Sequence, residues 1–355
     1  MAKTISGLRT WTAADIPTGC RVLVRVDANV TIKNGRADIS ASGRIARSIP
    51  EIKKLLKRHA RIILMTHLGS DTESTAPIAK AFSQLLDRPV LLAKDVVGKD
   101  ASQLSALLEP GSVMMLENLR SDRGEEENDV AFARHLALLG DVYVNNAFGV
   151  CHRKHASVVA MTKCLPSFAG ELLVREVSEL TQPIAKPFVL VVGGVKIDTK
   201  LPLLEKLGVH ASCVVVGSAL ADELAHHPKL SKHVHSLLGD KLQLPIDLRR
   251  DADHHAFDVG AKTEKMFATW LEGAATILWN GPVGVVEHAA GRHGTTALAN
   301  AIMASSARTI VGGGDTVAFL ESMKITKQFS WVSTGGGAML ALLAGEKLPG
   351  LEVLR

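Results

Sequence analysis

The chain has 355 residues, a formal net charge of +5 at pH 7, and a composition that is 46% hydrophobic and 22% charged. This length exceeds what one hydrophobic core usually organises, so it favours two domains or one large α/β domain and excludes a small stapled scaffold. No apolar stretch is long enough to span a membrane and the first residues lack a secretory signal, so we expect a cytoplasmic protein that binds no membrane. The four cysteines show no CxxC spacing, which favours a reducing compartment over zinc or disulfides.

The first half of the chain alternates short aliphatic runs with amphipathic stretches. The runs are RVLVRVDANV (21–30), RIILMTHLGS (61–70), VMMLENLRSD (113–122) and DVYVNNAFGV (141–150). The segments SIPEIKKLLKRH (48–59) and NDVAFARHLALL (128–139) have the periodicity of helices with one apolar face. Near-continuous apolar runs of this length are typical of parallel strands buried on both faces, so the pattern predicts repeated β-α units.

The second half repeats the pattern, with glycines after the strands. Its runs are FVLVVGGVK (188–196), CVVVGSALAD (213–222), TILWNGPVGV (276–285), RTIVGGGDTV (308–317) and SWVSTGGGAM (330–339). Between the halves, residues 164–182 offer an amphipathic helix that would join two domains. The predicted fold is therefore α/β, with two doubly wound parallel-sheet, Rossmann-like lobes at 1–163 and 183–340 and a hinge helix at 164–182.

The residues that follow the strands differ between the two halves. In the first half they are mostly cationic or polar: Asp27, Asn29, His67, Arg120, Asn146, His152, Arg153 and His155. In the second half they are glycines: Gly193–Gly194, Gly217, Gly281, Gly312–Gly314 and Gly335–Gly337. Ligands of open parallel sheets bind beyond the carboxyl ends of the strands. The first set suits a small multiply charged anion, and the second lets backbone N–H groups approach a phosphate, so we expect an acid-binding lobe and a nucleotide-binding lobe.

The nucleotide lobe carries neither standard fingerprint, since GxxxxGK[ST] is absent and no GxGxxG follows a strand. Lys196 and Lys200 share one face at the start of a predicted helix, where cations oppose the helix dipole and favour a bound anion. Asp315 is interpreted as the N-cap of a helix from Thr316, as a ligand of Mg²⁺, or as both. Glu287 is either a ribose-hydroxyl acceptor or an ordinary solvated glutamate.

Two histidine-rich segments have different interpretations. His226, His227, His233 and His235 lack cysteines or carboxylates in zinc-ligand spacing, so a solvated surface is favoured over a metal site. The segment His152-Arg153-Lys154-His155 follows a strand and a glycine, and clustered positive charge at such a turn favours a bound anion. Nucleic acid is not expected, because no run of five or more Lys and Arg occurs and aromatic residues make up only 4% of the chain.

Taken together, these segments resemble the phosphoglycerate kinase family. The resemblance extends over LENLR, GDVYVNNAFGVCHRKHAS, LPSFAGELL, VVGGVKIDTK, LPIDL, FDVGAKT, WNGPVGV, VGGGDT and VSTGGGAMLALLAGEKLPGL, in the order of the family and over nearly the whole chain. It implies reversible phosphoryl transfer between ATP and the carboxylate of 3-phosphoglycerate with Mg²⁺, by a monomer whose lobes close about a hinge. It also implies that residues 341–355 return toward the N-terminal lobe.

The resemblance also implies roles for residues at matching positions. The acid substrate would be held by Asp27, Asn29, Arg44, His67, Arg120 and Arg153. The nucleotide would be held by Gly193, Gly194, Lys196, Lys200, Gly217, Asn280, Glu287, Gly312, Gly313, Gly314, Asp315 and Thr316, with Asp315 as the metal ligand. Catalysis would depend on Arg44, Lys200, Gly335, Gly336 and Gly337. No general base is needed, because a carboxylate nucleophile is already ionised at pH 7 and the reaction needs alignment and charge neutralisation.

The chain departs from the family pattern at several positions. Ser70-Asp71 stands where the family has Arg-Pro, and the loss of a charge-assisted hydrogen bond costs about 1.5–3 kcal/mol. The other departures are Ala28 for Phe, Asn146 for Asp, Ser121-Asp122 for Phe-His, Ser218 for Gly, Ala341 for Glu, and a shorter segment between Gly217 and Leu244. We expect Arg47, Arg123 or Lys154 to replace the lost cation. The alternatives are a phosphotransferase for another carboxylic acid and a nucleotide-binding homologue without catalysis.

Overall fold

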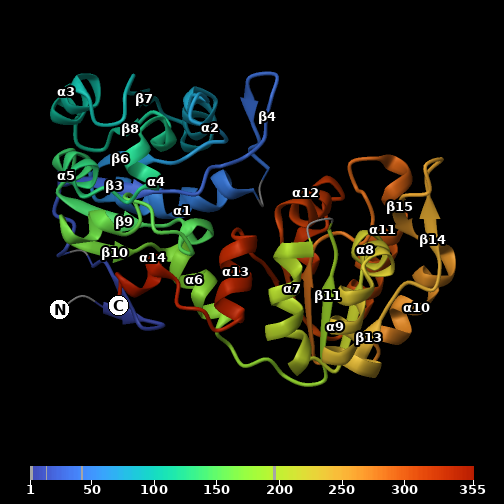
Figure 1. Cartoon of the computed structure of the whole chain (residues 1–355). Coiled ribbons are helices and arrows are strands. Elements are labelled where there is room, and N and C mark those ends of the chain that lie inside the picture. Colours follow the sequence, from blue (N-terminus) through green and yellow to red (C-terminus); the bar gives the residue numbers. More distant parts are fainter. Residues whose placement is uncertain (1–2, 13, 41–42, 195–196) are drawn as a thin grey trace. The chain divides into compact units, whose positions relative to one another are not determined.

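The computed structural model describes residues 3–12, 14–40, 43–194 and 197–355 (Figure 1). The chain forms two compact units, the first comprising Met1–Thr181 with Glu346–Arg355 and the second comprising Gln182–Gly345. The last ten residues therefore belong to the first unit, and their helix α14 (Pro349–Glu352) is joined to it by a hydrogen bond from Gly350 N–H to the Cys151 carbonyl. Among the described residues, no helix has the length and apolarity that crossing a bilayer requires.

The first unit is built on an eight-stranded sheet with the order β1-β2-β10-β9-β3-β6-β8-β7. Its strands are β1 (Lys3–Ile5), β2 (Leu8–Thr10), β3 (Arg21–Arg25), β6 (Arg61–Met65), β7 (Val90–Leu92), β8 (Val113–Met115), β9 (Val142–Asn145) and β10 (Ser167–Ala169). Only β1 pairs antiparallel among these described strands. Strand order reverses between β3 and β9, which places a ligand-binding switch point at their carboxyl ends.

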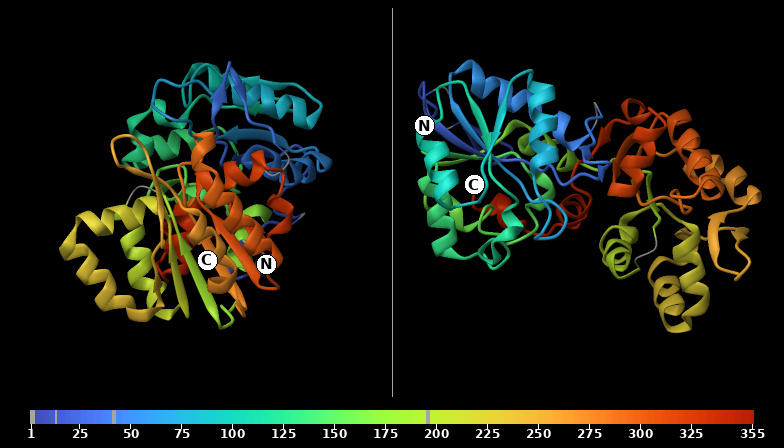
Figure 2. Two further views of the ribbon diagram at one scale, coloured as in Figure 1. Left: turned by 90° about the vertical axis from the view of Figure 1, so that its right-hand side faces the viewer. Right: turned by 90° about the horizontal axis from the view of Figure 1, so that it is seen from above.

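Both faces of this sheet are covered by helices (Figure 2, right). The helices are α1 (Arg44–Lys57), α2 (Ala76–Leu86), α3 (Lys99–Leu107), α4 (Arg123–Glu126), α5 (Val130–Leu138) and α6 (Glu171–Leu180). Side chains alternate between two cores along β3, since Val22 and Val24 belong to one and Leu23 belongs to the other. Burial on both faces explains why the strands read as uninterrupted apolar runs.

The second unit is built on a six-stranded, fully parallel sheet with the order β13-β12-β11-β16-β17-β18. Its strands are β11 (Phe188–Val192), β12 (Cys213–Val216), β13 (Leu242–Gln243), β16 (Thr276–Asn280), β17 (Arg308–Gly312) and β18 (Trp331–Val332). Its helices are α7 (Ile197–Lys206), α8 (Ser218–His226), α9 (Pro228–Leu238), α10 (Ala261–Leu271), α11 (His293–Ala304), α12 (Gly314–Ser322) and α13 (Gly336–Leu343), on both sides of the sheet (Figure 2, left). Its switch point lies between β11 and β16.

Two hairpins complete the units: β4 (Ile32–Lys33) with β5 (Arg36–Ala37) in the first, and β14 (Leu248–Arg250) with β15 (Ala256–Val259) in the second. The predicted α/β fold with two doubly wound parallel sheets is confirmed.

The segment 164–182 differs from the continuous helix expected there. Ser167–Ala169 form β10 and pair with β9, and the helix begins only at Glu171. Phe168 explains the difference, because as a strand residue it packs into the core of the first unit.

Candidate active site

The first unit gathers its predicted site residues at the carboxyl ends of β3 and β6. Asp27 and Asn29 follow β3, and His67 follows β6. Arg44 is the first residue of α1, and its Nη1 donates to the Asn29 carbonyl at 2.7 Å and lies 3.5 Å from Asp27 Oδ1. A guanidinium at a helix N-terminus opposes the helix dipole, so this position is favourable only when an anion is near. Asp27 supplies one, and a bound acid would supply another.

His67 is buried beneath these groups. Its Nδ1 lies 3.0 Å from Nη2 of Arg25, and its Nε2 lies 3.3 Å from the side-chain nitrogen of Asn29. Burial, followed by the charges of Arg25, Arg120 and Arg153, lowers the pKa of His67 to about 2. The imidazole is therefore neutral near pH 7.

Arg120 and Arg153 add charge to the same region. Arg120 lies in a 3₁₀ turn (Leu119–Ser121), where its Nη1 donates to the Gly69 carbonyl and its Nε lies 3.0 Å from Glu126. Burial and then Arg120 lower the pKa of the Arg153 guanidinium. Burial and then Arg153 lower the pKa of His155 to about 4. A guanidinium whose pKa is lowered by a neighbouring cation, as that of Arg153 is, would be stabilised by an anion placed beside it, which suits a substrate phosphate.

Two buried residues near this cluster were not predicted from the sequence. Arg25 is fully buried, and besides His67 it contacts Ser157 Oγ at 3.0 Å and the Val26 carbonyl at 2.7 Å. Glu125, also fully buried, accepts hydrogen bonds from the Ser157 N–H and hydroxyl. Arg25 ends an apolar strand, and that placement was the available signal, because a charge in such a run must find buried partners.

Asn146 occupies a structural position. Its Oδ1 accepts a hydrogen bond from Leu172 N–H at 2.9 Å and so ties the end of β9 to the first turn of α6. Glu51 of α1 caps the same helix through Glu171 N–H at 2.6 Å. These two side chains replace the N-cap side chain that Gly170 lacks.

The glycines of the second unit meet at the carboxyl ends of its central strands. A Cβ on Gly193 would lie 2.1 Å from the Pro282 carbonyl oxygen, and one on Gly281 would lie 2.1 Å from the Gly193 oxygen. A Cβ on Gly217 would lie 2.9 Å from Val283 Cα, and one on Gly336 would lie 2.9 Å from the backbone of Gly313. The loops after β11, β12, β16, β17 and β18 thus approach one another through backbone alone.

Lys200 of α7 reaches this glycine cluster. Its Nζ donates to Asn280 Oδ1 at the end of β16, and it would lie 4.0 Å from a Cβ on Gly194. Burial lowers the pKa of Lys200, and Asp315 partly opposes that shift. The ammonium is partly withdrawn from water and its hydrogen-bond partner, the Asn280 amide, is neutral. Such an ammonium is suited to bind a phosphate oxygen. Lys196, predicted beside it, lies outside the described residues.

The turn between β17 and α12 corrects one prediction. The helix begins at Gly314, its N-cap residue is Gly313, and no side chain caps it. Asp315 is therefore in the first turn, not at the N-cap, and its side chain is exposed. Thr316 is buried and its hydroxyl accepts a hydrogen bond from Gly281 N–H at 3.0 Å, so it fixes the glycine turn after β16. Gly313, with φ of 102°, needs the freedom of glycine there.

The remaining predicted groups lie as follows. Gly335 precedes α13, and Gly336 and Gly337 form its first turn against Gly313. Glu287 is exposed in the loop that follows β16. Within the described part of the chain, no interaction holds it near the glycines.

The clustered histidines of the second unit lie on the surface. His226, His227 and His233 are exposed, and His227 and His233 pair with Glu223 and Glu205 at 2.9 Å, as expected of a solvated surface.

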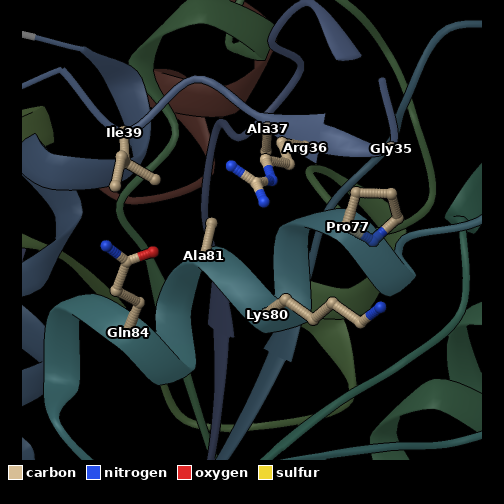
Figure 3. Close-up of a pocket in the computed structure, with 8 residues that line it drawn as sticks. All are labelled: Gly35, Arg36, Ala37, Ile39, Pro77, Lys80, Ala81 and Gln84. Atoms are coloured by element: carbon tan, nitrogen blue, oxygen red, sulfur yellow. The ribbon is translucent and has the colours of Figure 1, made fainter. Parts of the chain in front are cut away.

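A hollow of about 590 Å³ in the first unit lies apart from these residues (Figure 3). One side is helix α2, with Pro77, Lys80, Ala81 and Gln84, and the other is the β4–β5 hairpin. It contains none of the predicted site residues, so it is not part of the candidate site.

A glycine substitution tests the backbone packing of the second unit. We expect Gly193→Ala to weaken nucleotide binding by at least about tenfold, because the new methyl group would meet two backbone carbonyls that cannot rotate away. Nucleotide titration by calorimetry measures the change. Gly273→Ala is the control for a general loss of stability, since its φ of 68° strains an alanine while nothing lies within 4 Å of the added methyl group. Equal nucleotide affinity in wild type and Gly193→Ala would contradict the close approach.

The fold defines a class, a two-unit α/β protein with cationic and polar side chains at the strand ends of one unit and glycine turns at the strand ends of the other. Comparison with known proteins gives the family. The family model described as phosphoglycerate kinase matches residues 14–241 and 246–346, so the chain belongs to the phosphoglycerate kinase family, whose members are transferases.

Individual relatives agree with this assignment. The phosphoglycerate kinases of Thermomicrobium roseum and Moorella thermoacetica are each 39% identical, and each match covers 94% of this chain and 96% of the relative. The structure of phosphoglycerate kinase from Coxiella burnetii matches with a TM-score of 0.80 at 33% identity, over 98% of both chains. That of Pyrococcus horikoshii OT3 matches with a TM-score of 0.85 at 27% identity, over 96% of both chains. The resemblance inferred from the sequence is confirmed, and these matches do not favour either alternative function.

Proposed function

We propose that this protein transfers a phosphoryl group reversibly between ATP and the carboxylate of 3-phosphoglycerate, with Mg²⁺. The observation that carries the proposal is the gathering of Asp27, Asn29, His67 and Arg44 at the carboxyl ends of β3 and β6. Such a site accepts a small acid with a second anionic group. Membership of the phosphoglycerate kinase family supplies the substrate class.

In the first unit, the proposed roles follow the contacts. Arg44 binds the substrate carboxylate and the transferring group, Asp27 and Asn29 hold the hydroxyl and carboxylate, and His67, Arg120 and Arg153 hold the phosphate. A neutral His67 contributes a hydrogen bond, while the two arginines contribute charge.

In the second unit, the backbone N–H groups of the glycine turns and the ammonium of Lys200 hold the nucleotide phosphates, with Asn280 orienting that ammonium. The glycines at 193–194, 217, 312–314 and 335–337, together with Thr316, line the phosphate cradle. Lys196 is proposed as a further ligand of the nucleotide phosphates, and Glu287 is proposed to serve the ribose. Gly335–Gly337 place their N–H groups at the start of α13, where a helix N-terminus favours negative charge.

Asp315 fits the metal. Its carboxylate is exposed at the first turn of α12 and interacts electrostatically with Lys200, so it lies at the edge of the cradle. Mg²⁺ prefers oxygen ligands and is usually held by one or two carboxylates together with substrate phosphates. Bound there, it would neutralise charge on the phosphate oxygens. Lys200, Arg44 and the glycine N–H groups would stabilise the oxygens of the transferring group, and no side chain would need to remove a proton.

The proposal is tested with purified protein in a coupled assay of ATP-dependent 3-phosphoglycerate phosphorylation. We expect turnover that requires Mg²⁺ and 3-phosphoglycerate, and we propose that the active form is a cytoplasmic monomer. A protein that binds ATP but shows no turnover at millimolar 3-phosphoglycerate would overturn the proposed activity. A panel of other carboxylic acids, measured in parallel, identifies a different preferred acceptor.

Ser70 stands where the family has an arginine, so the proposal includes another cation that takes the place of that arginine. A hollow of about 520 Å³ is lined by Ser70 and Arg120 together with Arg123, and also by the acidic Asp71, Glu126 and Glu127. Arg47 lies 3.8 Å from the buried Glu176 and Lys154 does not line the hollow. We therefore assign the compensating charge to Arg123.

Restoring a cation at position 70 should strengthen binding of the acid. We expect Ser70→Arg to lower the KM for 3-phosphoglycerate about tenfold at unchanged kcat, because it adds one charge-assisted hydrogen bond to the phosphate. Glu73, whose Oε1 accepts from Ser70 N–H at 3.0 Å, is the competing partner, so Ser70→Arg with Glu73→Gln should give the larger effect. An unchanged KM in the double variant would show that position 70 does not face the phosphate.

A further inference from the structure

We propose that Arg25 is a positioning residue that holds His67 in a single tautomer, with Nδ1 accepting and the Nε2–H presented to the substrate phosphate. The proposal rests on the proposed function for the identity of that phosphate. Its first half, the tautomer, concerns the protein alone and can be tested without any turnover.

The geometry around Arg25 fixes its guanidinium. The side chain is fully buried and donates through all three nitrogens: Nε to Ser157 Oγ at 3.0 Å, Nη1 to the Val26 carbonyl at 2.7 Å, and Nη2 toward His67 Nδ1 at 3.0 Å. Ser157 is itself fixed, because its hydroxyl donates to the buried Glu125 at 2.6 Å. These contacts hold the guanidinium beside His67.

The chemistry of arginine then decides the tautomer. A guanidinium has only donors and does not lose its proton in proteins, so Nδ1 of His67 must be the acceptor in this pair. A neutral imidazole with Nδ1 accepting carries its proton on Nε2. Burial together with Arg25, Arg120, Arg153 and His155 keeps the ring neutral, with a pKa of about 2.

That proton has no acceptor among the described residues. The polar neighbour of Nε2 is the side-chain nitrogen of Asn29 at 3.3 Å, and an amide nitrogen is also a donor. The Asn29 side chain is held in this orientation, since its Oδ1 accepts from Gly69 N–H at 3.2 Å. A buried donor without an acceptor is costly, and an anionic oxygen of the substrate supplies the missing acceptor.

Without Arg25 the preference reverses. If nothing donates to Nδ1, the ring can protonate there and accept at Nε2 from the Asn29 amide, which satisfies both groups. His67 then turns a lone pair toward the substrate phosphate in place of a proton. Arg25 thus controls affinity for the phosphate without touching it.

The wild-type protein provides the first test. Nitrogen-15 NMR of His67, assigned by comparison with His67→Gln, distinguishes the two tautomers. We expect Nδ1 to be unprotonated and Nε2 to be protonated, with no titration of the ring between pH 5 and 8. A protonated Nδ1 in wild type would overturn the proposal, and this measurement does not depend on any variant folding.

The second test uses Arg25→Met, with Arg21→Met at the other end of β3 as the matched control. Arg21 pairs with Asp141 at 2.7 Å, far along the strand from His67. We expect Arg25→Met to move the proton to Nδ1 and to raise the KM for 3-phosphoglycerate about tenfold with the KM for ATP unchanged, and Arg25→Lys to recover part of the loss.

These readouts separate the possible failures. A stability loss in Arg25→Met without a change of tautomer would assign Arg25 a purely structural role and overturn the proposal. A wild-type protein with the expected tautomer but no activity would overturn the proposed function and leave the assignment of the tautomer standing.

Discussion

Lys200→Met is expected to lower kcat for phosphoryl transfer by about 10²–10³-fold while changing the KM for ATP much less. Lys200 is the described cation that reaches the glycine cluster of the second unit, where its Nζ is bonded to Asn280. Burial lowers its pKa because water is excluded around it, and in such surroundings its charge acts strongly on a phosphoryl group. Methionine keeps most of the length and the apolar stem of lysine and removes the ammonium, with both its charge and its hydrogen bond to Asn280. Steady-state kinetics in the coupled assay measures both constants.

Lys206→Met serves as the control, because Lys206 is an exposed residue in the last turn of the same helix. It should retain nearly the wild-type kcat. If Lys200→Met kept kcat within about threefold of wild type, the ammonium would not stabilise the transition state, and its contact with Asn280 would have to be structural.

The strands of both sheets could be predicted from the sequence because they are buried on both faces. Val22, Leu23 and Val24 are all fully buried although they point to different cores, and this produces an unbroken apolar run. The strand Ser167–Ala169 could not be predicted in the same way. It is short, and its assignment depends on pairing with β9, which is a tertiary contact.

Much of the candidate site could also be predicted, since ligands of parallel sheets bind where strands end. The sequence pointed to Asp27 and His67 because each follows a strand. It did not predict the contact of Arg25 with Ser157, because these two residues are separated by 132 positions in the sequence. Strand order, which brings β3 beside both β6 and β9, creates that contact, and no local pattern encodes it.

The N-cap prediction for Asp315 failed for a related reason. Aspartate before a helix is a common cap, but here Gly313 adopts a positive φ and ends the loop two residues earlier. Gly336 of another loop packs closely against this turn, since a Cβ on Gly336 would lie 2.9 Å from Gly313. Such a tertiary contact is not encoded in any local pattern, and the Asp315 carboxylate is exposed.

The acid site leads to the second large effect, at Arg44. We expect Arg44→Gln to lower kcat about 100-fold and also to raise the KM for 3-phosphoglycerate, because in the proposed function Arg44 contributes charge both to the carboxylate and to the group being transferred. Arg44→Lys should lose less, since it keeps the charge, but an ammonium lacks the planar array of donors with which a guanidinium binds a carboxylate or a phosphate.

The exposed Lys53→Gln in the same helix controls for the general loss of a positive charge, and its kinetics should match those of wild type. Rate measurements with saturating ATP and varied 3-phosphoglycerate separate the two effects. A raised KM with unchanged kcat in Arg44→Gln would restrict Arg44 to substrate binding. In that case Lys200 and the glycine N–H groups would have to provide the stabilisation of the transferring group without a cation from the acid-binding unit.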